Sequence, residues 1–167
     1  LASAVLMFCS CDDFLTKSPK NDIGADAFFT SEKDLELYTN TWLNNLDYTD
    51  YVYGDENTDV VATRNGATYL QSGKWNANQQ SWGWTGLRSI NYMLDNMTKC
   101  KGNVSSTVYN HYEGVARFWR ASYYWDKVKT YGGVPWYDHV LKNTDTEELY
   151  KGRDSRQTVM RKILEDL

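Results

Sequence analysis

The fold is decided by the stretch Ala116-Arg117-Phe118-Trp119-Arg120-Ala121-Ser122-Tyr123-Tyr124-Trp125-Asp126, with its continuation Tyr131-Gly132-Gly133-Val134-Pro135. It closes a longer segment, Ser106 to Tyr131, in which apolar residues recur every three or four positions, as on the buried face of a helix. Gly132 and Gly133 supply a left-handed stop, and Pro135 prevents the helix from continuing. The spacing predicts one long amphipathic helix with a stripe of Val108, Tyr112, Val115, Phe118, Ala121, Trp125 and Val128.

Further helices are expected on both sides of this segment. Ser31 can cap a helix because an acidic residue follows three positions on. A second helix begins near Trp82 and ends at Gly102, and a last one begins near Asp154 or Ser155. Their expected core-facing residues are Leu35, Tyr38, Trp42 and Leu46, then Leu87, Ile90, Leu94 and Met97, then Val159, Met160, Ile163, Leu164 and Leu167. No pair of strands joined by a two-residue turn is evident, so the predicted class is all-α with helices packed as antiparallel pairs.

The polar sides of these helices are expected to face solvent. In the last helix, charges of both signs alternate, which is typical of a solvated face. The residues concerned are Arg88, Asn91 and Asp95 in the second helix, and Arg153, Asp154, Arg156, Arg161, Lys162, Glu165 and Asp166 near the last one. The net charge is -4, from 18 basic and 22 acidic residues, and no basic run appears. Nucleic-acid binding is therefore not predicted, because it requires a basic face.

Aromatic residues make up 15% of the chain, with 7 Trp and 13 Tyr among its 167 residues. Buried Tyr and Trp need partners for their polar atoms, so some of these rings are expected to face water or a ligand. The run of Trp119, Tyr123, Tyr124 and Trp125 is instead favoured as core packing, because it lies on the strongest amphipathic helix.

Residues 47–81 have no helical period and mix Tyr and Trp with small polar residues. A loop of this length is uncommon in a compact domain unless it is functional. Sugars bind to flat aromatic faces with polar side chains around them, and this composition fits that need. The predicted glycan-binding residues are the rings Tyr69, Trp75 and Trp82 with the polar partners Asp59, Arg64, Asn65, Asn76 and Gln79. Alternatively, the rings fix the loop onto the helices.

The first eleven residues are typical of a processing signal. The apolar run Leu1 to Phe8 is shorter than the roughly 20 residues of a membrane-spanning helix. It is followed by Ser10-Cys11-Asp12-Asp13, in which a small residue precedes a cysteine. Cys11 is therefore expected to become a lipidated N-terminus, anchored by acyl chains rather than by a span. A buried N-terminal element that contains two cysteines is the alternative, and Cys100 is expected to be an unreactive thiol at a helix end.

Residues 12–25 are expected to be a tether, and residues 26–167 the first part of a helical domain. The chain starts without Met and stops within an amphipathic pattern, so we expect it to belong to a longer protein.

No catalytic, cofactor or metal motif is evident. Asp55 opens a stretch like a calcium loop, but Val60 stands at the Gly position and Gly66 at the Glu position. His111 and His139 lie far apart without a neighbouring Cys or second His. Gly-rich phosphate loops, nucleophile elbows and zinc motifs are also absent from the sequence. The sequence predicts no cofactor and favours a binding protein over an enzyme.

Three segments together resemble the SusD/RagB family of outer-membrane glycan-binding lipoproteins. They are Cys11-Asp12-Asp13-Phe14-Leu15, the stretch 116–135 quoted above, and Arg153-Asp154-Ser155-Arg156-Gln157-Thr158-Val159. Trp82-Gly83-Trp84, Ile90-Asn91 and Asn96 lie where that family has an aromatic-led helix, whereas Trp119 and Ser122 depart from its pattern.

The resemblance implies a tetratricopeptide-like scaffold at the outer membrane of a Gram-negative bacterium, of which this chain would be about the N-terminal third. It implies a surface-exposed receptor that captures oligosaccharides or polysaccharides and delivers them to a SusC-like TonB-dependent transporter. Two other functions remain open on the residues alone. One is an all-helical glycoside hydrolase or lyase, and the other is a helical-repeat scaffold that binds only protein.

Overall fold

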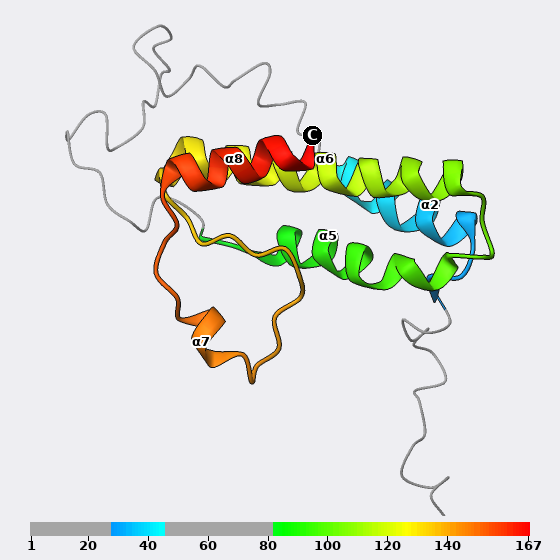
Figure 1. Cartoon of the computed structure of the whole chain (residues 1–167), viewed down its shortest axis with the longest axis horizontal. Helices are drawn as coiled ribbons and strands as arrows, with labels where there is room; N and C mark the ends of the chain where they lie inside the picture. Colours follow the sequence, from blue (N-terminus) through cyan, green and yellow to red (C-terminus); the bar gives the residue numbers. More distant parts are fainter. Residues whose placement is uncertain (1–27, 46–81) are drawn as a thin grey trace, which may run out of the picture.

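The computed structural model describes residues 28–45 and 82–167. Within them the elements are α2 (Glu32–Asn40), η2 (Thr41–Asn45), α5 (Thr85–Asn96), η5 (Met97–Cys100), α6 (Ser106–Tyr131), α7 (Thr146–Leu149) and α8 (Arg156–Asp166). No strand occurs in these two ranges, which confirms the all-α class; the repeat architecture implied by the resemblance stays a prediction. Consecutive long helices α5, α6 and α8 alternate in direction, as Figure 1 shows.

Helix α6 has the bounds that the sequence predicts. Ser105 caps it by accepting a hydrogen bond from the Val108 backbone N–H at 3.2 Å. At its other end Gly132 has a φ of 74°, a left-handed conformation that Gly adopts without steric cost. Gly133 has a different role from the expected stop: a Cβ atom there would lie 2.5 Å from the Asp154 carbonyl oxygen. This glycine allows the chain after α6 to lie against the chain before α8.

The bundle has two hydrophobic cores that share α6. The first lies between α2, α5 and the first half of α6 and contains Phe29, Leu35, Trp42, Ile90, Met93, Met97, Cys100 and Ala116. The second lies between the start of α5, the second half of α6, α8 and the segment after Gly132, and contains Leu87, Ala121, Tyr124, Val128, Val134, Trp136, Val159 and Ile163. Both α5 and α6 contribute to the two cores, and α6, with 26 residues the longest helix of the described region, runs along both of them.

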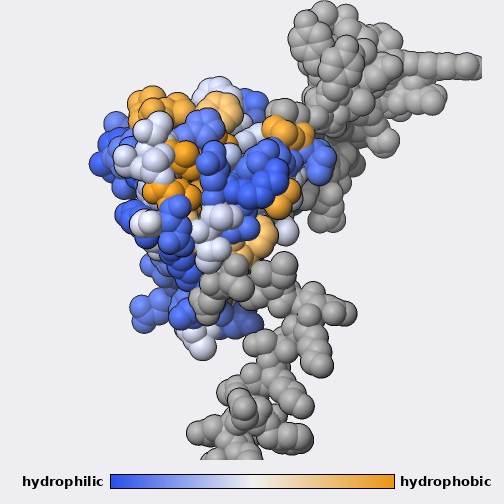
Figure 2. All heavy atoms as spheres, turned by 90° about the vertical axis from the view of Figure 1, so that its right-hand side faces the viewer, coloured by the Kyte–Doolittle hydropathy of each residue, from blue (hydrophilic) through white to orange (hydrophobic). Residues whose placement is uncertain are grey.

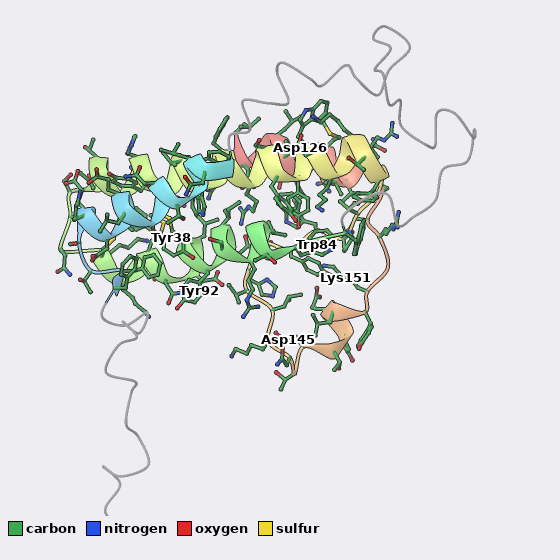
Figure 3. All side chains as sticks on the ribbon, turned by 180° about the vertical axis from the view of Figure 1, so that it is seen from behind. Tyr38, Trp84, Tyr92, Asp126, Asp145 and Lys151 are labelled. Atoms are coloured by element: carbon green, nitrogen blue, oxygen red, sulfur yellow. The ribbon has the colours of Figure 1, made fainter. Side chains whose placement is uncertain are left out.

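Many of the aromatic rings pack inside the bundle rather than toward a ligand. Phe29 lies 5.1 Å from Tyr38, and Tyr38 lies 5.8 Å from Trp42, measured between ring centroids. Figure 3 places Tyr38 and Tyr92 together near one end of the bundle and Trp84 near the other. The Tyr38 hydroxyl donates to the Ser89 carbonyl oxygen at 3.1 Å, which satisfies its polar atom. More of the aromatic rings therefore pack in the core than the aromatic content of the sequence predicted.

Two rings of the predicted stripe on α6 are not in the core. Phe118 is 56% exposed and Trp125 is 47% exposed, whereas Tyr124 is fully buried. The core prediction is thus correct for Tyr124, partly correct for Trp119 and Tyr123, and wrong for Phe118 and Trp125. The reason is that α6 packs against different helices along its length, so its buried face turns around the axis.

The end of the bundle where α5 connects to α6 has a mainly polar surface. Figure 2 views the bundle from the end where α5 connects to α6, and hydrophilic residues cover most of it. No helix in ranges 28–45 and 82–167 combines the length and hydropathy needed to cross a bilayer. Cys100 is buried at the end of η5, and burial raises the pKa of its thiol, in agreement with the unreactive role expected.

Replacing Asp34 with Ala is expected to lower the free energy of unfolding by about 1 kcal/mol. Its carboxylate accepts hydrogen bonds from the Ser31 hydroxyl at 2.8 Å, from the Ser31 backbone N–H at 2.9 Å and from the Thr30 backbone N–H at 3.1 Å. Partial burial opposes its ionisation, but these hydrogen bonds outweigh it and hold the pKa of Asp34 below its usual value. Urea unfolding at neutral pH measures the loss, with Glu32→Ala as a control in the same helical turn.

The pH dependence has a defined sign. A carboxylate with a lowered folded pKa contributes stability above its unfolded pKa, and this contribution is lost as pH falls through the folded value. The difference between wild type and Asp34→Ala should therefore shrink in acid. A stability difference between the two proteins that stays constant as the pH falls below the folded pKa of Asp34 would contradict the role given to its carboxylate.

A candidate binding pocket with aromatic and cationic walls

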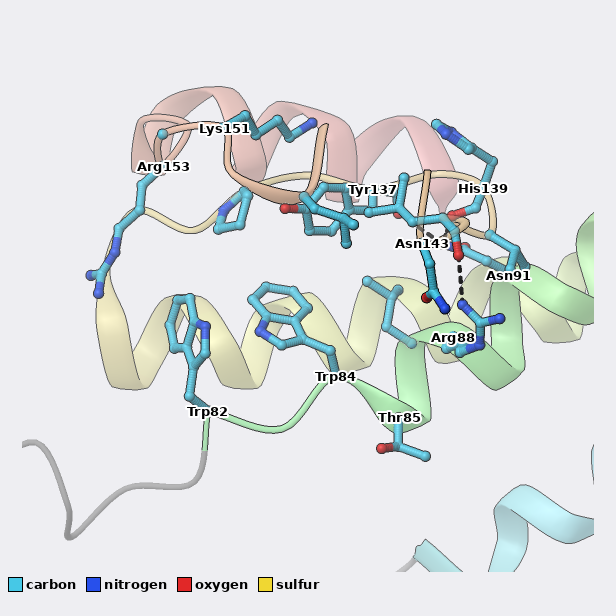
Figure 4. Close-up of a pocket in the computed structure, with 16 residues that line it drawn as sticks. Trp82, Trp84, Thr85, Arg88, Asn91, Tyr137, His139, Asn143, Lys151 and Arg153 are labelled. Atoms are coloured by element: carbon cyan, nitrogen blue, oxygen red, sulfur yellow. Dashed lines mark hydrogen bonds between the residues drawn. The ribbon is translucent and has the colours of Figure 1, made fainter. Parts of the chain in front are cut away.

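A pocket of about 680 Å³ lies beside the start of α5. The opposite wall is the wide loop of residues 134–153 that leaves the bundle after α6 and includes α7. Figure 4 shows its labelled side chains, with Trp82 and Arg153 at one end and Arg88 and Asn143 at the other. The lining residues are Trp82, Trp84, Thr85, Leu87, Arg88, Asn91, Pro135, Tyr137, His139, Val140, Leu141, Asn143, Leu149, Lys151, Gly152 and Arg153.

The segment 82–84 leads into α5 as irregular chain and not as helix. The predicted start near Trp82 is three residues too early, because α5 begins at Thr85. The two rings of this segment, Trp82 and Trp84, meet edge to face with centroids 5.1 Å apart, and Trp82 also lies 4.7 Å from Tyr131. Packing of these rings against α6 thus replaces the helical turn.

Lys127 lies among four of the aromatic rings behind the pocket. Its Nζ atom is 5.3–6.0 Å from the centroids of Trp82, Trp84, Tyr123 and Tyr131. Burial lowers the pKa of this ammonium group, and the rings' negative faces attract it. Burial also raises the pKa of the Tyr123 hydroxyl to about 12, and this hydroxyl donates to the Gly83 carbonyl oxygen. These contacts fix the aromatic wall on α6.

Asn91 holds the opposite wall. Its side-chain amide donates to the Tyr137 carbonyl oxygen at 3.0 Å and to the His139 carbonyl oxygen at 3.1 Å. The prediction that Asn91 faces solvent is wrong, because only 1% of it is exposed. The loop has no strand partner for these carbonyl groups, so a buried amide on α5 satisfies them instead.

Arg120 and Asp166 form a buried ion pair under the same loop. The Arg120 guanidinium donates two parallel hydrogen bonds to the Asp166 carboxylate, at 2.6 and 2.7 Å. It also donates to the Asp138 carbonyl oxygen at 3.1 Å and to the Asn91 side-chain oxygen at 3.3 Å. The assignment of Asp166 to a solvated face is wrong, since its side chain is only 5% exposed. The buried guanidinium of Arg120 needs a charged partner, and the Asp166 carboxylate on α8 provides it.

Tyr124 completes the support of the loop. Its ring stacks on Trp136 with centroids 4.2 Å apart, and its hydroxyl accepts a hydrogen bond from the Tyr137 N–H at 2.6 Å. Burial strongly raises the pKa of this hydroxyl, which therefore stays protonated. The Trp136 indole N–H is buried and has no acceptor within the described residues. Asp154 and Lys151 bind the backbone of Trp136 from the other side, through its N–H at 2.8 Å and its carbonyl oxygen at 2.7 Å.

The pocket can bind a ligand that presents both a flat apolar face and several hydrogen-bonding groups. Trp82 is 42% exposed and gives an aromatic surface, and Tyr137 gives a second ring. Arg88 and Lys151 supply donors, while Asn143 supplies both donors and acceptors. No group of three His, Cys, Asp or Glu residues that could hold a metal ion occurs in the described part of the chain.

Of the glycan-binding residues predicted from the sequence, only Trp82 lies in this pocket. The others lie outside the described residues, as does the lipidation site Cys11; they are Asp59, Arg64, Asn65, Tyr69, Trp75, Asn76 and Gln79. Sequence reasoning missed Trp84, Arg88, Tyr137 and Arg153 as pocket residues. The available signal was Trp84 directly before α5, because a tryptophan cannot cap a helix as Ser, Thr, Asp or Asn does.

Comparison with protein-family models, with curated protein sequences and with solved structures finds no match for this chain.

Proposed function

We propose that this chain is part of a surface glycan receptor, and that the pocket beside α5 is a binding site for an oligosaccharide. The observation that carries the proposal is the exposed ring of Trp82 in a pocket lined by several hydrogen-bonding side chains. Pyranose rings have apolar faces that stack on aromatic rings and hydroxyl groups that bind polar side chains. A cavity of about 680 Å³ is within the range of small-ligand sites.

The pocket favours binding over hydrolysis. A glycosidase needs two carboxylates separated by about 5–9.5 Å across the scissile bond. The described lining contains neither Asp nor Glu. An all-helical hydrolase or lyase would thus need a site elsewhere in the protein, and prolonged incubation with bound glycans followed by product analysis is the test.

The cellular role is proposed from the sequence resemblance. Lipidation at Cys11 would place the receptor on the outer membrane, and a SusC-like TonB-dependent transporter would accept the captured glycan. Mass spectrometry of the membrane-extracted protein tests the acyl modification, and co-purification tests the transporter. Neither result depends on the pocket, so the two parts of the proposal are tested separately.

A protein-binding scaffold is a second candidate, favoured by the exposed rings of Phe118 and Trp125 on α6. Exposed aromatic residues are enriched at protein interfaces. The two candidates differ in the face that they use, because neither ring lines the pocket.

Replacing Trp82 with Ala is expected to weaken oligosaccharide binding about tenfold, which corresponds to about 1.4 kcal/mol and is near the upper range for an aromatic contact. The matched control is Trp125→Ala, which removes an equally exposed Trp from outside the pocket. Glycan-array binding of the full chain, followed by calorimetry on each hit, gives the affinities. Equal losses in both variants, or no saturable binding to any glycan, would overturn the pocket assignment.

A further inference from the structure

The pocket is cationic although the whole chain is acidic. Arg88, Lys151 and Arg153 line it together with His139, and no Asp or Glu is among the described residues of its wall. The chain as a whole has a net charge of -4. The positive charges are therefore concentrated at this site against the overall balance.

The carboxylates that contact the segments forming the pocket are bound to other groups, and one of them, Asp138, pairs with the lining residue His139 at 2.9 Å. Asp95 accepts a hydrogen bond from the Val140 N–H at 2.8 Å, and Asp154 accepts one from the Trp136 N–H at 2.8 Å. Glu148 pairs with Lys151 at 2.8 Å and neutralises that one cation. Within residues 28–45 and 82–167, neither Arg88 nor Arg153 forms an ion pair with a carboxylate.

The two arginines are held in place without losing their capacity to bind anions. The Arg153 guanidinium carbon lies 4.9 Å from the Trp82 ring centroid, so the cation stacks on the exposed aromatic wall. Arg88 donates one hydrogen bond to the Leu141 carbonyl oxygen at 2.7 Å. A guanidinium group has five N–H donors, so each arginine keeps others for a ligand. Figure 4 shows the two side chains at opposite ends of the pocket.

The start of α5 adds to the positive potential. Its N-cap residue is Trp84, which provides no side-chain acceptor for the first turn. The N–H groups of that turn and the helix dipole therefore favour a negative group near Thr85. Thr85, Leu87 and Arg88 of this turn all line the pocket.

From these observations we infer that the ligand is an anionic oligosaccharide, with its carboxylate or sulfate groups bound by Arg153 and Arg88. This inference rests on the proposed glycan-binding function and specifies its substrate class. A neutral glycan could stack on Trp82 only by sharing that ring with the Arg153 guanidinium. An acidic sugar could bind both groups at once, because its anionic group would accept hydrogen bonds from the edge of the guanidinium while its ring contacts the aromatic wall.

The test compares acidic oligosaccharides with matched neutral forms on the full chain. The probes are oligomers of galacturonate, mannuronate and hyaluronan, each beside its carboxyl-reduced form, and a sulfated chondroitin oligomer beside its desulfated form. We expect at least one acidic probe to bind at least tenfold more tightly than its neutral form, and we expect this difference in affinity to decrease as the salt concentration rises. A difference in affinity for the sulfated pair alone supports the inference and identifies the bound anion as sulfate.

Arg153→Gln is the diagnostic variant, and Arg161→Gln on the exposed side of α8 is its matched control. Arg153→Gln should weaken binding of the acidic probe about tenfold without weakening binding of the neutral form, which gains access to the Trp82 ring, whereas Arg161→Gln should change neither affinity. If neutral forms bind as tightly as acidic ones, the inference is wrong and the glycan-binding function stands. If no probe and no neutral glycan binds, both the function and the inference are wrong.

Discussion

Replacing Arg120 with Met is expected to lower the free energy of unfolding by about 3–5 kcal/mol, the cost of removing one partner of a buried ion pair. The variant leaves the Asp166 carboxylate buried without its two charge-assisted hydrogen bonds. It also removes a donor from the Asp138 carbonyl oxygen. Chemical denaturation followed by circular dichroism measures the change, provided that the transition is two-state.

Two further variants distinguish the cost of leaving the Asp166 charge unpaired from the cost of removing any arginine side chain. Arg117→Met removes the exposed pair with Glu113, whose atoms are 3.3 Å apart, and should cost less than about 1 kcal/mol. The double variant Arg120→Met with Asp166→Met leaves no charge buried, so it should recover much of the loss. Equal costs for Arg117→Met and Arg120→Met would contradict the assigned role.

Replacing Gly133 with Ala is expected to destabilise the protein by about 3 kcal/mol, at the upper end for overpacking. The added Cβ would lie 2.5 Å from a backbone oxygen of Asp154, so one of the two chain segments must move. Gly152→Ala is the matched control, because a Cβ there meets nothing within 4 Å and its φ is not in the left-handed region. Thermal unfolding of the two variants gives the comparison.

The shift of these two chain segments in Gly133→Ala should also change the position of the pocket wall. Gly133 precedes Pro135 and Tyr137, while Asp154 follows Lys151 and Arg153 on the same wall. Ligand affinity in Gly133→Ala should therefore fall together with stability. A variant as stable as Gly152→Ala would show that the two segments can separate without cost.

The helices could be predicted from the sequence, whereas the pocket could not. Helix α6 follows from a regular apolar period and from Gly132 and Pro135, which are local signals. The pocket joins the start of α5 to a loop about 50 residues later, as the hydrogen bond from Arg88 to Leu141 illustrates. No local spacing encodes that meeting, so only Trp82 among the pocket's rings was identified in advance.

The polar errors have a common physical cause. An amphipathic pattern assigns polar residues to solvent, and Asn91 and Asp166 were placed there by that rule. Both side chains are buried because the irregular loop and Arg120 need hydrogen-bonding partners inside the bundle. The exposed rings of Phe118 and Trp125 are the converse case, in which an apolar residue on a regular stripe faces outward.

The support of the 134–141 segment has a consequence for how this part of the molecule could be transplanted. Its backbone shape is set largely by side chains from elsewhere in the chain: Arg88, Asn91 and Asp95 of α5, Arg120 and Tyr124 of α6, and Lys151 and Asp154 before α8. The local sequence of the segment therefore does not determine its backbone conformation by itself. A graft onto another helical pair would keep its form only if those supporting side chains were transferred with it, while the outward-facing positions could be exchanged to present a different recognition surface.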